Sequence, residues 1–321
     1  METPASDTPK RRSKWLRIPI YLLAGLGVLF IGLIIAIVIH ERRQPDHTLD
    51  ANDAVDGVMT RNYGKYSEAQ QGWLYVDEQN HASYVVTVVQ QKKLEGKEGD
   101  ELYLVTSGRP LDPEHGGVPF YGVFQLRWRD GKFYEYGDTY RYEGTEPVTP
   151  ERVRFEALSA DVWGWVVKTF DQGDGEYPEA VTRNVVLAPH GEQIAVLAEF
   201  NAMRELVGDG GCEETERRHA TWEQAHSVQT AASAPADGAS APAGGEAADG
   251  EDMEPIRCTR LQWTYRTDPV GDSTFTPLYV TRKAGMLEGK PMPEKTWKVM
   301  FDPKSFTYRL PDELKAEAED R

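Results

Sequence analysis

Arginine and tyrosine residues alternate around a predicted tight turn, and this pattern suits the binding of a ligand. The dipeptide Asp130-Gly131 favours a type I′ turn between two strands. Because side chains alternate between the two faces of a strand, one face carries the candidate ligand-binding residues Arg127, Arg129, Tyr134 and Tyr136. Guanidinium groups bind anions through paired N–H donors, and tyrosine rings offer flat surfaces to a sugar. Cross-strand packing of arginine on tyrosine, or cover by another element, remains the alternative.

The same turn predicts the register of the two strands. The expected partners are Arg129 with Lys132, Trp128 with Phe133, Arg127 with Tyr134, Leu126 with Glu135, and Gln125 with Tyr136. The opposite face then holds four apolar residues that we expect in the core, Phe124, Leu126, Trp128 and Phe133. Tyr140 and Tyr142 have the parity of Tyr136, so we expect them on the arginine and tyrosine face.

A second pattern resembles a set of metal ligands. The residues step by four, three, four and three positions, and they are Cys212, Glu216, His219, Glu223 and His226. On a helix this spacing stacks them on one side, where His and Glu side chains can hold zinc or copper. Charged residues surround the same segment, however, so we favour a solvated helical face and expect no metal and no cofactor.

Catalytic motifs are missing from the sequence. It contains no Gly-x-Ser-x-Gly elbow, no phosphate-binding loop ending in Gly-Lys-Ser/Thr, no His-Glu-x-x-His and no Cys-x-x-Cys. We therefore assign no catalytic residue and favour a protein that is not an enzyme. A hydrolase whose carboxylates have no local signature stays open.

Mostly β-strands must position these residues. Runs rich in β-branched and aromatic residues predict strands at 72–76, 83–89, 101–105, 152–157, 180–188, 256–267, 274–282, 295–301 and 304–310. Helices are predicted at 192–207 and 213–229. Residues 159–170 fit either a helix or a strand buried on both faces, and we slightly favour the helix. The fold class is thus α+β, mostly antiparallel β.

Residues 18–39 form a run of 22 residues without a charge. As a helix this run is about 33 Å long, enough to cross a bilayer core of about 30 Å. It is longer than the apolar region of a signal peptide, and His40-Glu41-Arg42-Arg43 follows it instead of small residues. We therefore predict an uncleaved single transmembrane helix.

The charges beside this helix predict its orientation. Five basic residues precede it within 17 residues, and only two follow directly, so the N-terminus is expected in the cytoplasm. No asparagine begins an Asn-x-Ser/Thr glycosylation signal. We therefore expect a bacterial inner-membrane protein with a periplasmic domain.

Cys212 and Cys258 both fall in the exported part, where disulfides persist. Between them, residues 230–252 consist of Ala, Gly, Pro, Ser, Thr and acidic residues without a large apolar side chain. Such a segment is typical of a disordered insert. We predict a disulfide at its base that holds the flanking elements together.

Composition agrees with a folded exported domain and argues against nucleic acid. The chain has 321 residues, 27% of them charged and 40% hydrophobic, with a formal net charge of −16. Nucleic-acid binding needs a basic surface. The expected organisation is a cytoplasmic tail at 1–17, the transmembrane helix at 18–39, a stalk at 40–57, the β-rich domain at 58–315, and a C-terminal tail at 316–321.

Three functions remain open for this organisation. A short cytoplasmic tail and the missing catalytic motifs favour an envelope adaptor or assembly subunit that binds a partner protein. The first alternative is a membrane-tethered module that binds a glycan or an anionic ligand at the arginine and tyrosine face. The second is the cryptic envelope hydrolase. The expected partners are the lipid bilayer and an envelope protein.

Overall fold

The structure is a computed structural model. It describes residues 48–49, 54–95, 99–112, 117–129, 132–142, 144–174, 176–232, 254–272 and 274–319. The predicted transmembrane helix at 18–39 lies outside these residues, as does the predicted turn at 130–131. No helix in the described part of the chain combines the length and the apolar character needed to cross a membrane.

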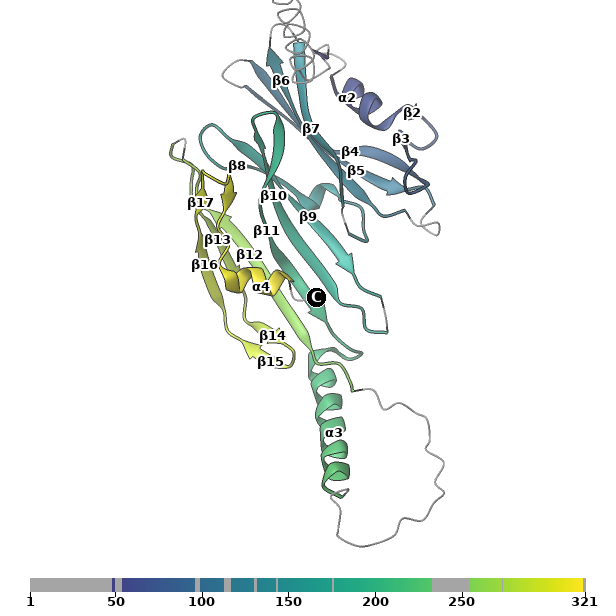
Figure 1. Ribbon diagram of the computed structural model, residues 1–321, viewed down its shortest axis with the longest axis vertical. Helices are drawn as coiled ribbons and strands as arrows, with labels where there is room; N and C mark the ends of the chain where they lie inside the picture. Colours follow the sequence, from purple (N-terminus) through teal and green to yellow (C-terminus); the bar gives the residue numbers. More distant parts are fainter. Residues whose placement is uncertain are drawn as a thin grey trace, which may run out of the picture. The chain divides into compact units, whose positions relative to one another are not determined.

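The first sheet has seven strands in the order β1-β7-β6-β5-β4-β3-β2 (Figure 1). They are β1 (Thr48–Leu49), β2 (Tyr66–Ser67), β3 (Gly72–Asp77), β4 (Ala82–Glu95), β5 (Asp100–Pro110), β6 (Phe120–Arg129) and β7 (Lys132–Tyr142). From β2 to β7 each strand pairs antiparallel with the next strand of the chain. The sheet is therefore a meander, and its connections are local.

The second sheet has nine strands. They are β8 (Val153–Ala157), β9 (Trp163–Gln172), β10 (Ala180–His190), β11 (Gln193–Leu206), β12 (Thr259–Thr267), β13 (Leu278–Arg282), β14 (Gly285–Leu287), β15 (Lys290–Met292) and β16 (Lys295–Val299). The order β15-β14-β12-β11-β10-β9-β8 forms its main path, and β13 joins β12 to β16. The short pair β17 (Phe301–Asp302) and β18 (Thr307–Tyr308) follows. Each predicted strand overlaps an observed one, but 274–282 is strand only at 278–282 and 304–310 only at 307–308. The mostly antiparallel β class is confirmed.

Three apolar clusters hold these layers together. Helix α2 (Ala54–Tyr63) covers one face of the first sheet with residues spaced for a single helical face, Ala54, Val58, Met59 and Tyr63. The other face of the first sheet packs on β9 and β10 through Tyr103, Val105, Tyr121, Val123, Trp165, Val167, Val185 and Leu187. The far side of β9 to β11 packs on β12, β13, β16 and α4 (Asp312–Glu319) through Val186, Phe200, Leu261, Val280, Trp297 and Leu314.

The predicted helices at 192–207 and 159–170 are wrong. Residues 193–206 form β11, which pairs with β10 along its whole length, and residues 163–172 form β9. Strand β9 is buried on both faces: Trp165 points into the core between the sheets and Val166 into the opposite core. Strand β11 packs Ile194 and Val196 against the first of these cores and Ala198 and Phe200 in the second, although Glu199 is exposed. A strand with two buried faces is apolar without alternation, so its pattern resembles that of a buried helix.

Two further helices extend into segments expected to be irregular. Helix α2 begins at Ala54, so it overlaps the expected stalk at 40–57, and α4 overlaps the expected tail at 316–321. Both helices bury apolar residues in the adjoining core, which is why they belong to the folded domain.

Helix α3 (Gly211–Ala232) confirms the predicted helix at 213–229 and projects away from the sheets (Figure 1). It covers the first three residues of the expected disordered insert at 230–252, whose other residues lie outside the described chain. At its base, Cys212 and Cys258 form the predicted disulfide, with their Cα atoms 5.2 Å apart. Glu216 of α3 accepts a hydrogen bond of 2.6 Å from the backbone N–H of Cys258, so the covalent bond and a polar contact join the same two segments.

Each outer helix is also anchored by a largely buried arginine–glutamate pair. In α2, Arg61 forms an ion pair with Glu135 of β7, and burial lowers the pKa of Arg61. In α4, Glu317 forms an ion pair with Arg282 of β13, whose side chain is only 2% exposed. Burial raises the pKa of Glu317 even though Arg282 opposes the shift, which shows how strongly this carboxylate has been removed from water.

We predict that Glu317→Ala lowers the free energy of unfolding by about 3–5 kcal/mol, because it leaves the Arg282 guanidinium buried without its counter-charge. Glu313→Ala on the same helix is the matched control. Its ion pair with Lys295 is about half exposed, so its loss is expected to cost less than about 1 kcal/mol. Chemical denaturation of the two variants measures the difference, and equal losses would contradict the anchoring role of Arg282.

Replacing both cysteines with alanine is expected to lower the free energy of unfolding by at most about 4 kcal/mol, because the bridge closes a long loop in the unfolded chain. Thermal melting with and without reductant gives the same comparison on the unaltered protein. A melting temperature that does not respond to reductant would show that the bridge adds no stability.

Candidate functional site

The arginine and tyrosine face predicted from the sequence has the expected strand register. The Cα partners of β6 and β7 are residues 129 and 132, 128 and 133, 127 and 134, 126 and 135, and 125 and 136. Phe124, Leu126 and Phe133 are buried in the cluster under α2, and Trp128 packs against it. All five expected pairs are therefore confirmed, as is the apolar face of the hairpin.

The expected place of Tyr140 is wrong. A register shift between Tyr121 and Val123 interrupts the β6–β7 ladder, and the extra residue reverses the parity of the strand beyond it. Tyr140 consequently stacks on Phe120, with ring centroids 4.4 Å apart, on the side of the sheet that faces α2. Tyr140 therefore does not continue the face that holds Tyr136, and Tyr142 is the Cα partner of Phe120 in the ladder.

Arg127 is the centre of the predicted face. Its guanidinium carbon lies 5.3 Å from the centroid of the Tyr136 ring, a cation–π arrangement. Tyr134 is its partner across β6 and β7, and Glu101 is its partner across β5 and β6. The Nε of Arg127 is buried and has no hydrogen-bond partner. The structure thus brings Arg127, Tyr134 and Tyr136 together, and Arg129, which is exposed at the end of β6, lies near enough to lower the pKa of Tyr136.

A polar network continues from this face toward the core between the sheets. Glu101 accepts hydrogen bonds from the Tyr103 hydroxyl at 2.6 Å and from Gln125 Nε2 at 2.9 Å. Burial and the neighbouring Glu101 raise the pKa of Tyr103, so its hydroxyl keeps its proton and acts as a donor. Tyr103 also contacts Trp165 of β9, with ring centroids 5.4 Å apart. The network therefore lies where the first sheet meets the second.

The second sheet brings negative charge to the same place. Burial raises the pKa of Tyr136, Arg127 opposes the shift, and Glu192 from the turn between β10 and β11 raises it further. Two carboxylates, Glu101 and Glu192, therefore lie among the two arginines of the face.

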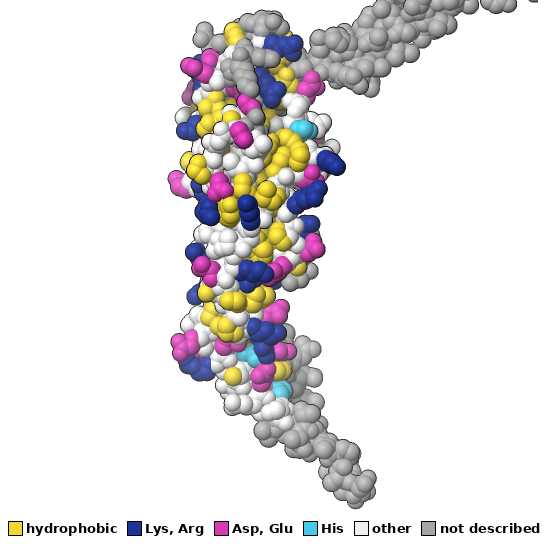
Figure 2. All heavy atoms as spheres, turned by 90° about the vertical axis from the view of Figure 1, so that its left-hand side faces the viewer, with side chains coloured by type: hydrophobic (Ala, Val, Ile, Leu, Met, Phe, Trp, Pro, Cys, Tyr) yellow, Lys and Arg dark blue, Asp and Glu magenta, His cyan; other side chains and the backbone are white. Residues whose placement is uncertain are grey.

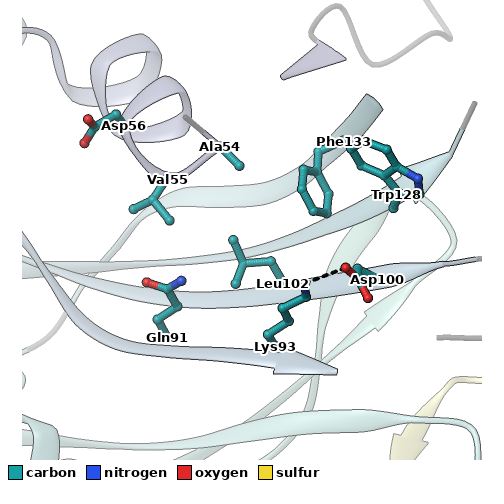
Figure 3. Close-up of a pocket in the computed structure, with 9 residues that line it drawn as sticks. All are labelled: Ala54, Val55, Asp56, Gln91, Lys93, Asp100, Leu102, Trp128 and Phe133. Carbon is teal, nitrogen blue, oxygen red and sulfur yellow. Dashed lines mark ion pairs between the residues drawn. The ribbon is translucent and has the colours of Figure 1, made fainter. Parts of the chain in front are cut away.

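A pocket lies on the opposite face of the first sheet, beside the start of α2 (Figure 3). Its volume is about 390 Å³, and its apolar wall consists of Val55, Leu102, Trp128 and Phe133. Trp128 and Phe133 meet edge to face, with centroids 5.0 Å apart. An ion pair of 2.5 Å between Lys93 and Asp100 lies at its rim. An apolar wall with a charged rim suits a nonpolar side chain or ring, and sequence reasoning placed the two aromatic residues only in the core.

The side chains on α3 that resemble metal ligands have other partners. His219 lies 3.0 Å from Glu254 Oε1 and accepts a hydrogen bond of 3.1 Å from Arg257 Nε, while Glu223 pairs with Arg257. His226 lies 2.9 Å from the backbone oxygen of Trp222. Among the described residues, no group of three or more His, Cys, Asp or Glu side chains is arranged to hold a metal ion.

Apolar side chains are exposed along the edge strand β3. Leu74 and Val76 point to one face with exposures of 38% and 60%. Strand β2 pairs only with Gly72 and Trp73, and Leu74 N–H donates to Lys65 O at 2.9 Å on the same side. Because the direction of backbone hydrogen bonding alternates along a strand, the N–H and C=O of Val76 point to this same outer side. On that side no described strand pairs with residues 75–77, which pair with β4 on the other side. Figure 2 shows that one face of the molecule intersperses hydrophobic side chains with both signs of charge.

Comparison with known proteins identifies no relative. No protein-family model, no curated protein sequence and no solved structure matches this chain. The assignment of a function therefore rests on the geometry of these surfaces.

We predict that the double variant Arg127→Ala, Tyr134→Ala loses binding to envelope glycans if this face holds a sugar. Cross-strand pairs contribute about 0.2–1 kcal/mol each, so the domain should stay folded. Glycan-array or pull-down binding together with circular dichroism measures both properties. Unchanged glycan binding by the folded double variant would show that the sugar lies elsewhere.

Proposed function

We propose that the protein is a single-pass inner-membrane protein whose periplasmic β-rich domain binds a partner protein, as an envelope adaptor or assembly subunit. The open edge of β3, with Leu74 and Val76 exposed on one face, is the observation that supports this function. A partner segment in extended conformation can add to such an edge, taking its affinity from backbone hydrogen bonds and its specificity from alternate side chains.

The two halves of this sheet edge differ in a way that favours β3 as the docking strand. Beyond the reach of β3, the outer part of β4 carries Lys92 and Lys93, both exposed. Lysine residues on an edge disfavour pairing with another chain. Strand β3 has two exposed apolar side chains instead, so a partner strand gains apolar burial there.

The location in the inner membrane is part of the same proposal. The apolar run at 18–39 and the basic residues before it favour an uncleaved anchor with a cytoplasmic N-terminus. A disulfide between Cys212 and Cys258 fits an oxidising compartment. Together these features support a domain held at the periplasmic side of the membrane.

We predict that Val76→Pro abolishes capture of the partner. Proline has no N–H to donate to an added strand, but at this position the N–H points away from β4, so the sheet itself tolerates the change. Val76→Thr is the matched control, because it keeps the N–H and the β-branched shape. Mild cross-linking in intact membranes, affinity pull-down and mass spectrometry against an anchor-only control measure the partner.

A stoichiometric envelope protein should be recovered with the wild type and with Val76→Thr, and should fall by at least about fivefold with Val76→Pro. Equal recovery with Val76→Pro would rule out addition of a strand at this edge. Failure of the unaltered protein to capture any partner would contradict the adaptor function and favour the ligand-binding alternative at Arg127 and Tyr134.

A further inference from the structure

A second, charged cleft lies between the two sheets, away from the face of Arg127. Its volume is about 310 Å³, near the lower end of the range for small-molecule sites. The first sheet contributes Tyr121, Asp138 and Arg141, and the second contributes Thr169, Arg183 and Glu199. Residues on separate sheets, far apart in the chain, thus converge on one space.

The topology explains why these side chains face each other. Thr169 and Arg183 are partners across β9 and β10, two positions along from the partners Val167 and Val185. Val167 and Val185 point into the apolar core between the sheets, so Thr169 and Arg183 point the same way at the end of that core. Arg141 is the partner of Tyr121, another residue of this core, across β6 and β7.

The two arginines use few of their hydrogen-bond donors within the protein. Arg141 donates from one guanidinium nitrogen to Asp138 Oδ2 at 3.1 Å. Arg183 Nε lies 3.8 Å from Glu199 Oε1, beyond hydrogen-bond distance, although the Arg183 side chain is only 16% exposed. A guanidinium group has five N–H donors. Among the described residues, Arg183 makes no hydrogen bond through any of its five.

No ion pair crosses this cleft within the described part of the chain. Each arginine faces a carboxylate of its own sheet, Arg141 with Asp138 and Arg183 with Glu199. Glu199 is 53% exposed, so it can turn into solvent at little cost. A bound oxyanion would replace this distant partner with short, charge-assisted hydrogen bonds from Arg183.

We infer that this cleft binds a small ligand that carries an oxyanion, a carboxylate or a phosphate, held by Arg183 and Arg141 between the two sheets. Arg183 donates hydrogen bonds to the oxyanion from the guanidinium N–H groups that have no partner among the described residues, and Arg141 adds a second positive charge from the first sheet. Glu199 competes with the ligand for Arg183. This site is independent of the β3 edge and of the Arg127 face.

Because Glu199 competes with the ligand for Arg183, removing its charge should increase the affinity for the ligand, whereas removing Arg183 should decrease it. Calorimetric titration of the full-length protein in detergent uses three probes: inorganic phosphate, D-glucuronate and neutral D-glucose. Glu199→Gln removes the competing charge and should tighten binding of at least one of the charged probes by about tenfold, whereas Arg183→Met should weaken it by about tenfold or more. Any binding of D-glucose, which the Arg127 face would account for, should be the same in the wild type and in both variants.

Arg260→Met is the matched control, because Arg260 also pairs with a carboxylate across two strands, Glu205 at 2.7 Å, outside the cleft. It should leave the binding of both charged probes unchanged. Response to glucuronate alone identifies a carboxylate ligand, response to phosphate alone a phosphate ligand, and response to both a site that recognises the shared charge.

The inference is overturned if neither charged probe binds to the wild type or to Glu199→Gln, or if Glu199→Gln weakens binding. It is also overturned if Arg260→Met has the same effect as Arg183→Met. Should Arg183→Met fail to fold, Glu199→Gln still decides the matter, because its half-exposed side chain leaves the core untouched. None of these outcomes depends on capture of a partner protein at β3.

Discussion

Burial of β9 and β10 on both faces is the constraint on which the rest of the structure depends. Trp165, Val167, Val185 and Leu187 fill the core shared with the first sheet, while Val166 and Val186 fill the core shared with β12, β13 and β16. Removing these apolar faces from water is the main source of stability for such layers. Because the middle layer supports both neighbours, every other element is placed relative to it.

Where the apolar layer ends, charged and polar groups take over, and the candidate sites lie there. At one end of the core between the sheets, Glu101, Tyr103 and Gln125 form a hydrogen-bonded network next to Arg127. In a separate part of the boundary, Arg141 and Arg183 line the charged cleft. Half-buried charges need a counter-charge or hydrogen-bond partners. A ligand group that binds at these borders can supply them.

The outer elements are secured by polar interactions set into apolar contacts. Helices α2 and α4 each add a largely buried arginine–glutamate pair to their packed face, and α3 is joined to the sheet by the disulfide. Such interactions add little attraction in net terms but penalise any shifted arrangement, because a shift leaves a buried charge alone. The edge of β3 has no comparable cover among the described residues, which is why it stands out as a surface for a partner.

The sequence by itself determined the local features of this protein. The Asp130-Gly131 turn was enough to predict the β6–β7 register, and the spacing of Cys212 and Cys258 about a segment without large apolar residues was enough to predict the disulfide. In the hairpin the controlling forces act between residues near in the chain, whereas the disulfide joins residues 46 positions apart and was predicted from composition and from the expected oxidising compartment. Only the tertiary structure decided that 193–206 is a strand, because burial on two faces removes the alternation that separates strand from helix. It also decided that Tyr140 leaves the face of Tyr136, since a bulge reverses side-chain parity, and that Arg141 and Arg183 share a cleft, since packing of two sheets brings them together.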